Sequence, residues 1–86
     1  MLRGEILGLF IEPMTEQQLN IRIGEKVASL RTKKNLTQKE LANLIDSEYQ
    51  NISRLERGLV NPGAYFLYKI AVALETTLSD LLQFEE

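Results

Sequence analysis

The sequence predicts an all-α fold, with five short helices that form a single small domain. Apolar residues recur three or four positions apart in several segments, as they do on the buried face of a helix. Polar residues suited to helix starts precede these segments, and glycine or proline follows some of them. The 86 residues, 44 % of them hydrophobic, suffice for one thin core.

The first helix is predicted from about Asn20 to Lys34. Its apolar face is formed by Ile23, Val27 and Leu30. Thr15 followed by Gln18 matches a capping box, so an earlier start of this helix stays open.

A tight turn is predicted to join the second and third helices. Thr37, with Glu40 three residues later, forms a capping box that starts the second helix. The apolar stripe of that helix consists of Leu41, Leu44 and Ile45. We expect the helix to stop near Asp46, and Ser47 to cap the third helix.

The third helix has an apolar side and a polar side. Ile52 and Leu55 face the core, and the outward residues carry carboxylate, hydroxyl, amide or guanidinium groups. Such side chains can meet base edges and phosphates in the major groove of DNA. Gly58 fits the position after the helix, where a left-handed backbone favours glycine.

Pro62 closes the loop that leads to the fourth helix, predicted from about Ala64 to Leu74. Its core side consists of Leu67, Ile70, Ala71 and Leu74. Thr76 or Thr77 then caps the last helix, with Asp80 as the acidic partner three residues after Thr77. That helix holds Leu78, Leu81 and Leu82.

The composition excludes several kinds of site. The chain has no Cys and no His, so we expect neither a disulfide nor a metal site, and we expect no cofactor. It also has no Gly-rich phosphate loop and no clustered acid pair, so of the possible functions an enzymatic one is the least supported by the sequence. The apolar run Ile6 to Ile11 is too short to span a bilayer and lacks the features of a secretory signal. We therefore expect a cytoplasmic protein without a membrane contact.

Residues 1–19 are predicted to be an N-terminal extension, and residues 20–86 the helical domain. The extension holds an apolar cluster that ends at Glu12 and Pro13, where proline bars helix continuation. This cluster needs a surface on which to be buried, either by packing within its own chain or as part of a dimer interface. Met14 is an alternative start of the natural protein, and the sequence leaves this open.

The charges are unevenly distributed around a net charge of −2. Residues 20–61 hold eight Lys or Arg against five acidic residues, a net charge of +3, and the segments on either side are acidic. Such asymmetry favours steering toward phosphate groups. Lys33 and Lys34 have an alternative explanation as a solvated helix end, where cations interact favourably with the helix dipole.

Four blocks of residues occur in order between Ile23 and about Leu82. They comprise Ile23, Gly24, Leu30 and Arg31; Leu36, Thr37, Gln38, Glu40, Leu41 and Ala42; Ile52, Ser53, Leu55, Glu56, Arg57 and Gly58; and Asn61, Pro62, Lys69, Ile70, Ala71, Ala73 and Leu74. In these blocks the chain resembles the Cro/C1-type helix-turn-helix family of small bacterial and phage regulators, also called the xenobiotic-response-element family. The resemblance implies a lambda-repressor-like domain that binds double-stranded DNA through its third helix.

The resemblance also implies roles for individual positions. The base-reading candidates are Glu48, Tyr49, Gln50, Ser53 and Arg54. Among them Gln50 suits adenine and Arg54 suits guanine, because both side chains make bidentate contacts. The DNA-backbone candidates are Gln38, Lys33, Lys34, Asn51, Arg57 and Asn61. Arg57 has an equal alternative, the capping of helix-end carbonyls, and Arg31 with Glu56 is expected to form a partly buried structural ion pair between the first and third helices.

The fourth helix carries more apolar residues than its core side needs. Tyr65, Phe66, Tyr68 and Val72 lie where relatives of this family are usually polar, and with Leu82 and Phe84 they form the predicted interface of a homodimer. The alternative is that residues 6–11 fold back over this face within one chain.

We therefore expect a sequence-specific transcriptional regulator, such as a repressor, that acts as a homodimer on a two-fold operator. A cognate toxin is the kind of protein partner that a resemblance to antitoxin-type autoregulators implies. The alternative function is a protein-interaction module of the same fold with little DNA reading. Asp46 and Glu48 favour the module, whereas Gln38, Gln50 and Arg54 favour DNA binding.

Overall fold

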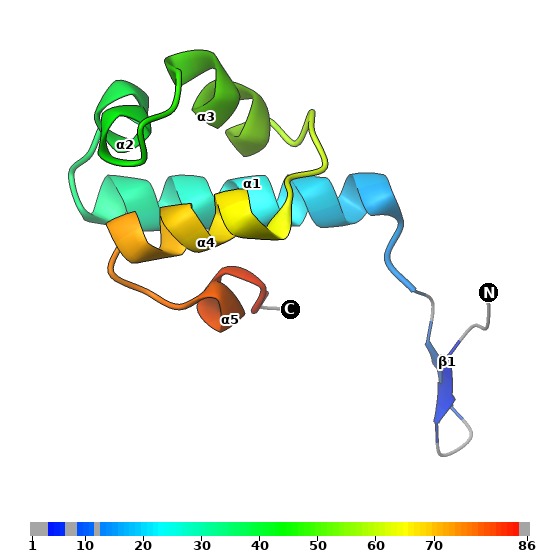
Figure 1. Cartoon of the computed structure of the whole chain (residues 1–86). Helices are drawn as coiled ribbons and strands as arrows, with labels where there is room; N and C mark the ends of the chain where they lie inside the picture. Colours follow the sequence, from blue (N-terminus) through cyan, green and yellow to red (C-terminus); the bar gives the residue numbers. More distant parts are fainter. Residues whose placement is uncertain (1–3, 7–8, 12, 85–86) are drawn as a thin grey trace.

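The structure is a computed structural model of the chain, and it describes residues 4–6, 9–11 and 13–84. Within these residues the helices are α1 (Glu16–Lys33), α2 (Gln38–Leu44), α3 (Tyr49–Glu56), α4 (Ala64–Ala73) and α5 (Leu78–Leu81). In Figure 1, α2 and α3 lie on one side of α1 and α5 lies on the other, while α4 contacts both α2 and α5. The predicted five-helix fold is confirmed. No helix in the described ranges is long and apolar enough to cross a membrane.

The N-terminal extension contains two short strands, β1 (Gly4–Ile6) and β2 (Leu9–Ile11). They pair antiparallel, with Gly4 opposite Ile11 and Ile6 opposite Leu9. Figure 1 shows these strands away from the helices, beyond the first turn of α1. The alternative to a homodimer interface was that residues 6–11 fold back over the fourth helix. The described part of the extension does not cover α4.

Three of the predicted helix caps are present. Thr15 and Gln18 form a complete capping box, so α1 begins at the earlier of the two expected starts. Thr37 and Glu40 form a second capping box at α2. At α5 the hydroxyl of Thr77 accepts a hydrogen bond from the backbone N–H of the third residue of the helix. These caps satisfy N–H groups that have no partner within a helix.

The predicted cap of the third helix is wrong. The residue before α3 is Glu48, not Ser47, and it makes no side-chain cap hydrogen bond. The hydroxyl of Ser47 instead accepts a hydrogen bond of 3.0 Å from the Asn51 side-chain amide. The Ser47 hydroxyl therefore contacts the side chain of Asn51 on the outer side of α3 and not a backbone N–H group.

The core lies between the helices, and among the residues whose burial is described Asn20 is its one polar member. Its buried hydrophobic residues are Ile23, Val27, Leu41, Ala42, Ile45, Ile52, Leu55, Leu67, Ile70, Ala71, Leu74 and Leu81. Leu44, which the sequence placed on the apolar stripe of the second helix, is 59 % exposed. Leu41 and Ile45 lie one turn apart on the buried face of α2, and Leu44 falls beside that face at the end of the helix.

Two glycines set how closely α3 and the loop after it approach α1. A Cβ at Gly24 would lie 2.4 Å from the carbonyl oxygen of Leu55, so only glycine permits this approach of α1 and α3. Gly58 adopts a φ of 73° after α3, as predicted, and a Cβ there would meet Ile21. The close approach places the end of α3 within reach of side chains on α1.

Candidate nucleic-acid interface

α3 presents a row of polar side chains on the side away from the core. Ile52 and Leu55 are fully buried and fix the orientation of the helix. Four of the predicted base-reading residues, Glu48, Tyr49, Gln50 and Arg54, are exposed, and Ser53 is half-buried beside them. Figure 1 shows α3 at the outer side of the molecule, next to α2. The structure therefore brings these five residues together on one accessible element.

Arg31 and Glu56 form a bidentate ion pair that joins α1 to the end of α3. The Nε of Arg31 lies 2.6 Å from Oε2 of Glu56, and its second terminal nitrogen lies 2.9 Å from Oε1. The two side chains are only 14 % and 5 % exposed. Arg31 also donates a 2.7 Å hydrogen bond to the carbonyl oxygen of Leu36. The hydrogen bonds to Glu56 raise the pKa of Arg31 above its ordinary value, against the opposing effect of burial.

Gln38 joins this pair at the first residue of α2. Its Nε2 donates a 2.8 Å hydrogen bond to Oε1 of Glu56. A carboxylate only accepts hydrogen bonds, so this contact fixes which end of the amide faces the protein. One N–H and the carbonyl oxygen of Gln38 remain for another partner. The ion pair thus holds the side chain of Gln38, a predicted DNA contact, in one orientation. The hydrogen bond between Gln38 and Glu56 was not predicted from the sequence.

Three other backbone candidates are exposed and already make contacts within the protein. Asn51 donates to the hydroxyl of Ser47, as described above. The Nε of Arg57 donates a 3.3 Å hydrogen bond to the carbonyl oxygen of Ser53, which is the alternative expected for this residue. Asn61 donates a 2.8 Å hydrogen bond to a carboxylate oxygen of Glu16 and so ties the loop after α3 to the start of α1.

Lys33 and Lys34 are not brought together with the exposed side of α3. The ammonium group of Lys34 forms a hydrogen bond and ion pair with Glu75, in the turn after α4. This contact lowers the pKa of the Glu75 carboxyl below its ordinary value. Lys33 lines a pocket with Phe84, on the side of α1 that faces α5.

The positive charge found in residues 20–61 therefore lies mainly on α1. From Thr37 to Asn61, Lys39, Arg54 and Arg57 are opposed by four acidic residues, Glu40, Asp46, Glu48 and Glu56. The segment that holds α2 and α3 thus has a net charge of −1.

An exposed apolar surface lies on α4 and the end of α2. Tyr65, Tyr68 and Val72 are 72 %, 52 % and 57 % exposed, and the two tyrosine rings stack with centroids 6.3 Å apart. A groove of about 460 Å³ runs between the two helices, and Leu44, Tyr68 and Val72 are among its lining residues. We call Leu44, Tyr65, Tyr68 and Val72 the α4 patch.

The other predicted interface residues lie elsewhere. Phe66 is partly buried against the core and faces a shallow pocket that it shares with Asn51, Arg54 and Val60. Phe84 is also partly buried, beside α1. Leu82 is 45 % exposed at the end of α5. The predicted interface residues therefore lie on different parts of the surface. The α4 patch also contains Leu44, which was not among the predicted interface residues.

Comparisons with known proteins agree on the kind of protein. The profile of a family described as Helix-turn-helix matches residues 27–81. An HTH-type transcriptional regulator of Archaeoglobus fulgidus is 34 % identical over 61 residues, which cover 71 % of this chain and 86 % of the relative.

Solved structures give the same result. The restriction-modification controller protein C.AhdI from Aeromonas hydrophila superposes with a TM-score of 0.70 and 31 % identity, over 72 % of this chain and 94 % of its own. An HTH_3 family transcriptional regulator from Vibrio cholerae has a TM-score of 0.74 and 27 % identity, over 78 % of this chain and 38 % of its own. These relatives are regulators, in agreement with the expectation that the chain is not an enzyme.

Proposed function

Because this chain belongs to the Helix-turn-helix family of transcriptional regulators, we propose that it recognises a specific DNA sequence as a homodimer on a two-fold operator. The observation that carries the proposal is the exposed polar row of α3, with Gln50 and Arg54 on its accessible side. Both side chains can make bidentate contacts to base edges in a major groove.

The proposed contacts divide into reading and positioning. Gln50 and Arg54 discriminate between bases, and Tyr49 and Ser53 contribute at the same face. Gln38 binds a phosphate through the N–H that Glu56 leaves free. The carboxylate of Glu56 keeps the Gln38 amide oriented before DNA binds, and this reduces the conformational entropy lost on binding.

The homodimer is supported by the α4 patch. Large apolar side chains gathered on the surface of a lone domain are unfavourable in water, and an interface buries them. The groove beside the patch gives a second copy a place to insert side chains. A two-fold dimer also places two reading helices about 34 to 36 Å apart, one turn of DNA. The proposed site of action is the cytoplasm, where the DNA of a bacterial cell lies.

Selection from randomised duplex DNA with the purified chain tests the proposed function. We expect an enriched site made of two half-sites related by a two-fold axis, with centres about 10 base pairs apart or a multiple of that spacing. A pool that stays random after several rounds, under salt conditions that permit binding, would contradict sequence-specific recognition. A single enriched half-site would contradict the two-fold arrangement.

Sedimentation of variants tests the dimer. Tyr68→Lys combined with Val72→Lys should separate the subunits, because it buries two charges in the proposed interface. Leu59→Lys is the matched control, since Leu59 is also exposed but lies in the loop after α3. A native chain that sediments as a monomer at about 10 μM would contradict the proposal, because an interface with a micromolar Kd persists there.

A further inference from the structure

A pocket of about 320 Å³ lies on the side of α1 opposite to α3. One wall is a single face of α1, and the other consists of Gln83 and Phe84, the residues that follow α5. We propose that this pocket binds a nucleotide that carries at least two phosphate groups. Its volume lies at the lower end of the range for small-molecule sites. The proposed DNA contacts on α2 and α3 do not use it.

The wall on α1 has the chemistry of a polyphosphate site. Lys26, Ser29 and Lys33 are three and four residues apart, so they lie on one face of the helix. The two lysines are about 10 Å apart along the helix axis, with the hydroxyl between them. A chain of two or three phosphates can contact both ammonium groups and accept a hydrogen bond from Ser29.

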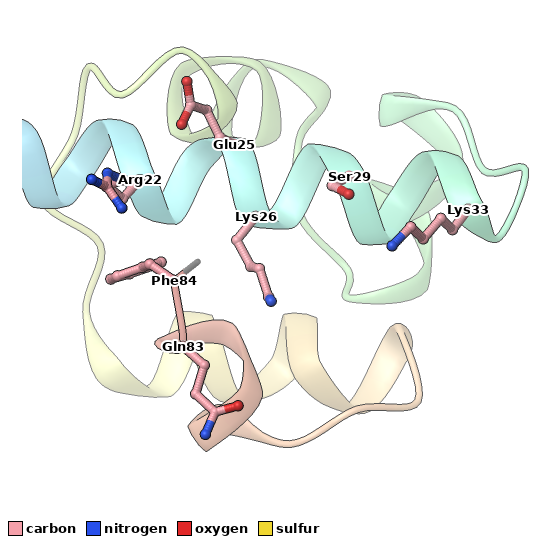
Figure 2. A pocket seen from close by; sticks show the side chains of 7 residues that line it. All are labelled: Arg22, Glu25, Lys26, Ser29, Lys33, Gln83 and Phe84. Carbon is pink, nitrogen blue, oxygen red and sulfur yellow. The ribbon is translucent and has the colours of Figure 1, made fainter. Parts of the chain in front are cut away.

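The ammonium groups of Lys26 and Lys33 are available to a ligand. Within the described ranges neither lysine makes a hydrogen bond or an ion pair. Figure 2 shows Lys26 extending from α1 toward α5, while the Glu25 carboxylate points to the opposite side of α1. The charge of Lys26 also contributes, as the smallest cause, to the lowered pKa of Asp80, which is set mainly by hydrogen bonds from Thr76 and Thr77.

The distribution of charge also favours an anionic ligand here. Among the described lining residues, Lys26 and Lys33 bring two ammonium groups to the pocket, whereas the carboxylate of Glu25 points to the other side of α1. An anion bound in the pocket would lie beside these two ammonium groups, on the side of α1 away from α3.

Phe84 distinguishes a nucleotide from a simple anion. Its ring lies at the Arg22 end of the pocket, with Lys33 at the other end (Figure 2). A base can stack on this ring while its phosphates extend along α1 toward Lys33, since aromatic side chains stack on any base. Gln83 adds an amide that can donate to the base or accept from it.

Isothermal titration calorimetry of the whole chain with adenosine 5′-triphosphate, inorganic triphosphate and adenosine tests the proposal. We expect saturable binding of the nucleotide, weaker binding of inorganic triphosphate and none of adenosine alone. Lys26→Gln combined with Lys33→Gln should weaken nucleotide binding about tenfold, because two charge-assisted contacts are lost. Phe84→Leu keeps an apolar side chain and should weaken binding of the nucleotide but not of inorganic triphosphate.

The matched control is Lys39→Gln combined with Lys69→Gln, which removes the same charge from α2 and α4. Equal losses in the two double variants would mean non-specific attraction and would overturn the proposal. No saturable binding up to about 1 mM nucleotide would do the same. An unchanged affinity of Phe84→Leu would overturn the assignment of a nucleotide. Amide shifts on titration should appear at Ser29, Lys33 and Phe84, and none of these outcomes depends on whether the chain binds DNA.

Discussion

Replacing Glu56 by glutamine should both destabilise the fold and weaken DNA binding. The change removes the carboxylate that accepts two hydrogen bonds from Arg31 and one from Gln38. Glutamine keeps one side-chain oxygen that accepts hydrogen bonds, but its amide nitrogen cannot accept and the group has no charge. Arg31, whose side chain is 14 % exposed, therefore loses its counter-charge and one of its hydrogen bonds to residue 56, and keeps the hydrogen bond to the carbonyl of Leu36. A guanidinium group in that position lacks both its counter-charge and most of its contact with water.

The size of the effect follows from the burial of the pair. Breaking a buried ion pair by removal of one partner costs about 3 to 5 kcal/mol, and the hydrogen bonds that Arg31 keeps to the glutamine oxygen and to Leu36 place this case near 3 kcal/mol. For a domain of this size, such a loss lowers the midpoint of thermal unfolding by about 12 to 24 °C. The one remaining acceptor oxygen at position 56 is shared between Arg31 and Gln38, so the Gln38 amide is held less firmly. Its weaker orientation should also cost about 1 kcal/mol in DNA affinity, as for loss of one oriented hydrogen bond.

Circular dichroism melting and fluorescence-anisotropy titration with the selected operator measure the two effects separately. Glu25→Gln is the control for charge, since Glu25 is exposed on α1 and makes no hydrogen bond within the described ranges. Arg31→Met combined with Glu56→Leu is the control for stability, because apolar replacement of a whole buried pair is often neutral or stabilising. This double variant should regain most of the melting temperature but not the DNA affinity, since leucine cannot hold Gln38.

A loss of less than about 1 kcal/mol in Glu56→Gln would refute the reasoning, because that is the value of an exposed ion pair. Full DNA affinity in the double variant would refute the positioning of Gln38 by Glu56.

Three further predictions concern packing, acid and salt. Gly24→Ala should destabilise the fold by about 1 to 3 kcal/mol in urea unfolding, because its Cβ meets backbone atoms of α3; a neutral effect would contradict the close packing. The lowered pKa of Glu75 predicts a contribution to stability that is present above its unfolded pKa and is lost as the pH falls through its lower folded pKa. Acid unfolding of Glu75→Gln, followed by circular dichroism, should therefore lack that part of the pH dependence. Arg57→Gln should flatten the salt dependence of DNA binding by about two units in a dimer, whereas Lys34→Gln, whose charge is paired with Glu75, should change it less; equal changes would contradict the assignment.

Local sequence signals predicted most of the helices, because caps and apolar spacing act over a few residues. The capping boxes at Thr15 and Thr37 and the left-handed Gly58 are of this kind. Ser47 does not cap the third helix because Glu48 occupies the cap position, and the Ser47 hydroxyl accepts a hydrogen bond from the side-chain amide of Asn51. Leu44 was misplaced because helical periodicity alone does not give the edge of the face that neighbouring helices cover.

Features that depend on how the helices cross were not predictable from spacing. The bond between Gln38 and Glu56 joins residues 18 positions apart and exists only because the start of α2 lies near the end of α3. The net charge of residues 20–61 also did not show on which side of the first helix each basic residue lies. The structure places Lys26 and Lys33 on the side toward α5, because a helix distributes successive residues around its axis.

The most direct test of the proposed function compares binding of Arg54→Ala to the selected operator and to a scrambled duplex of equal length and equal salt. We predict that the variant loses about 1 to 3 kcal/mol on the operator and much less on the scrambled duplex, because a guanidinium in the major groove reads a base. The same comparison for Gln50→Ala should relax a different position of the site. Equal losses on both duplexes would show that α3 contributes only charge or stability, and would contradict sequence reading by this helix.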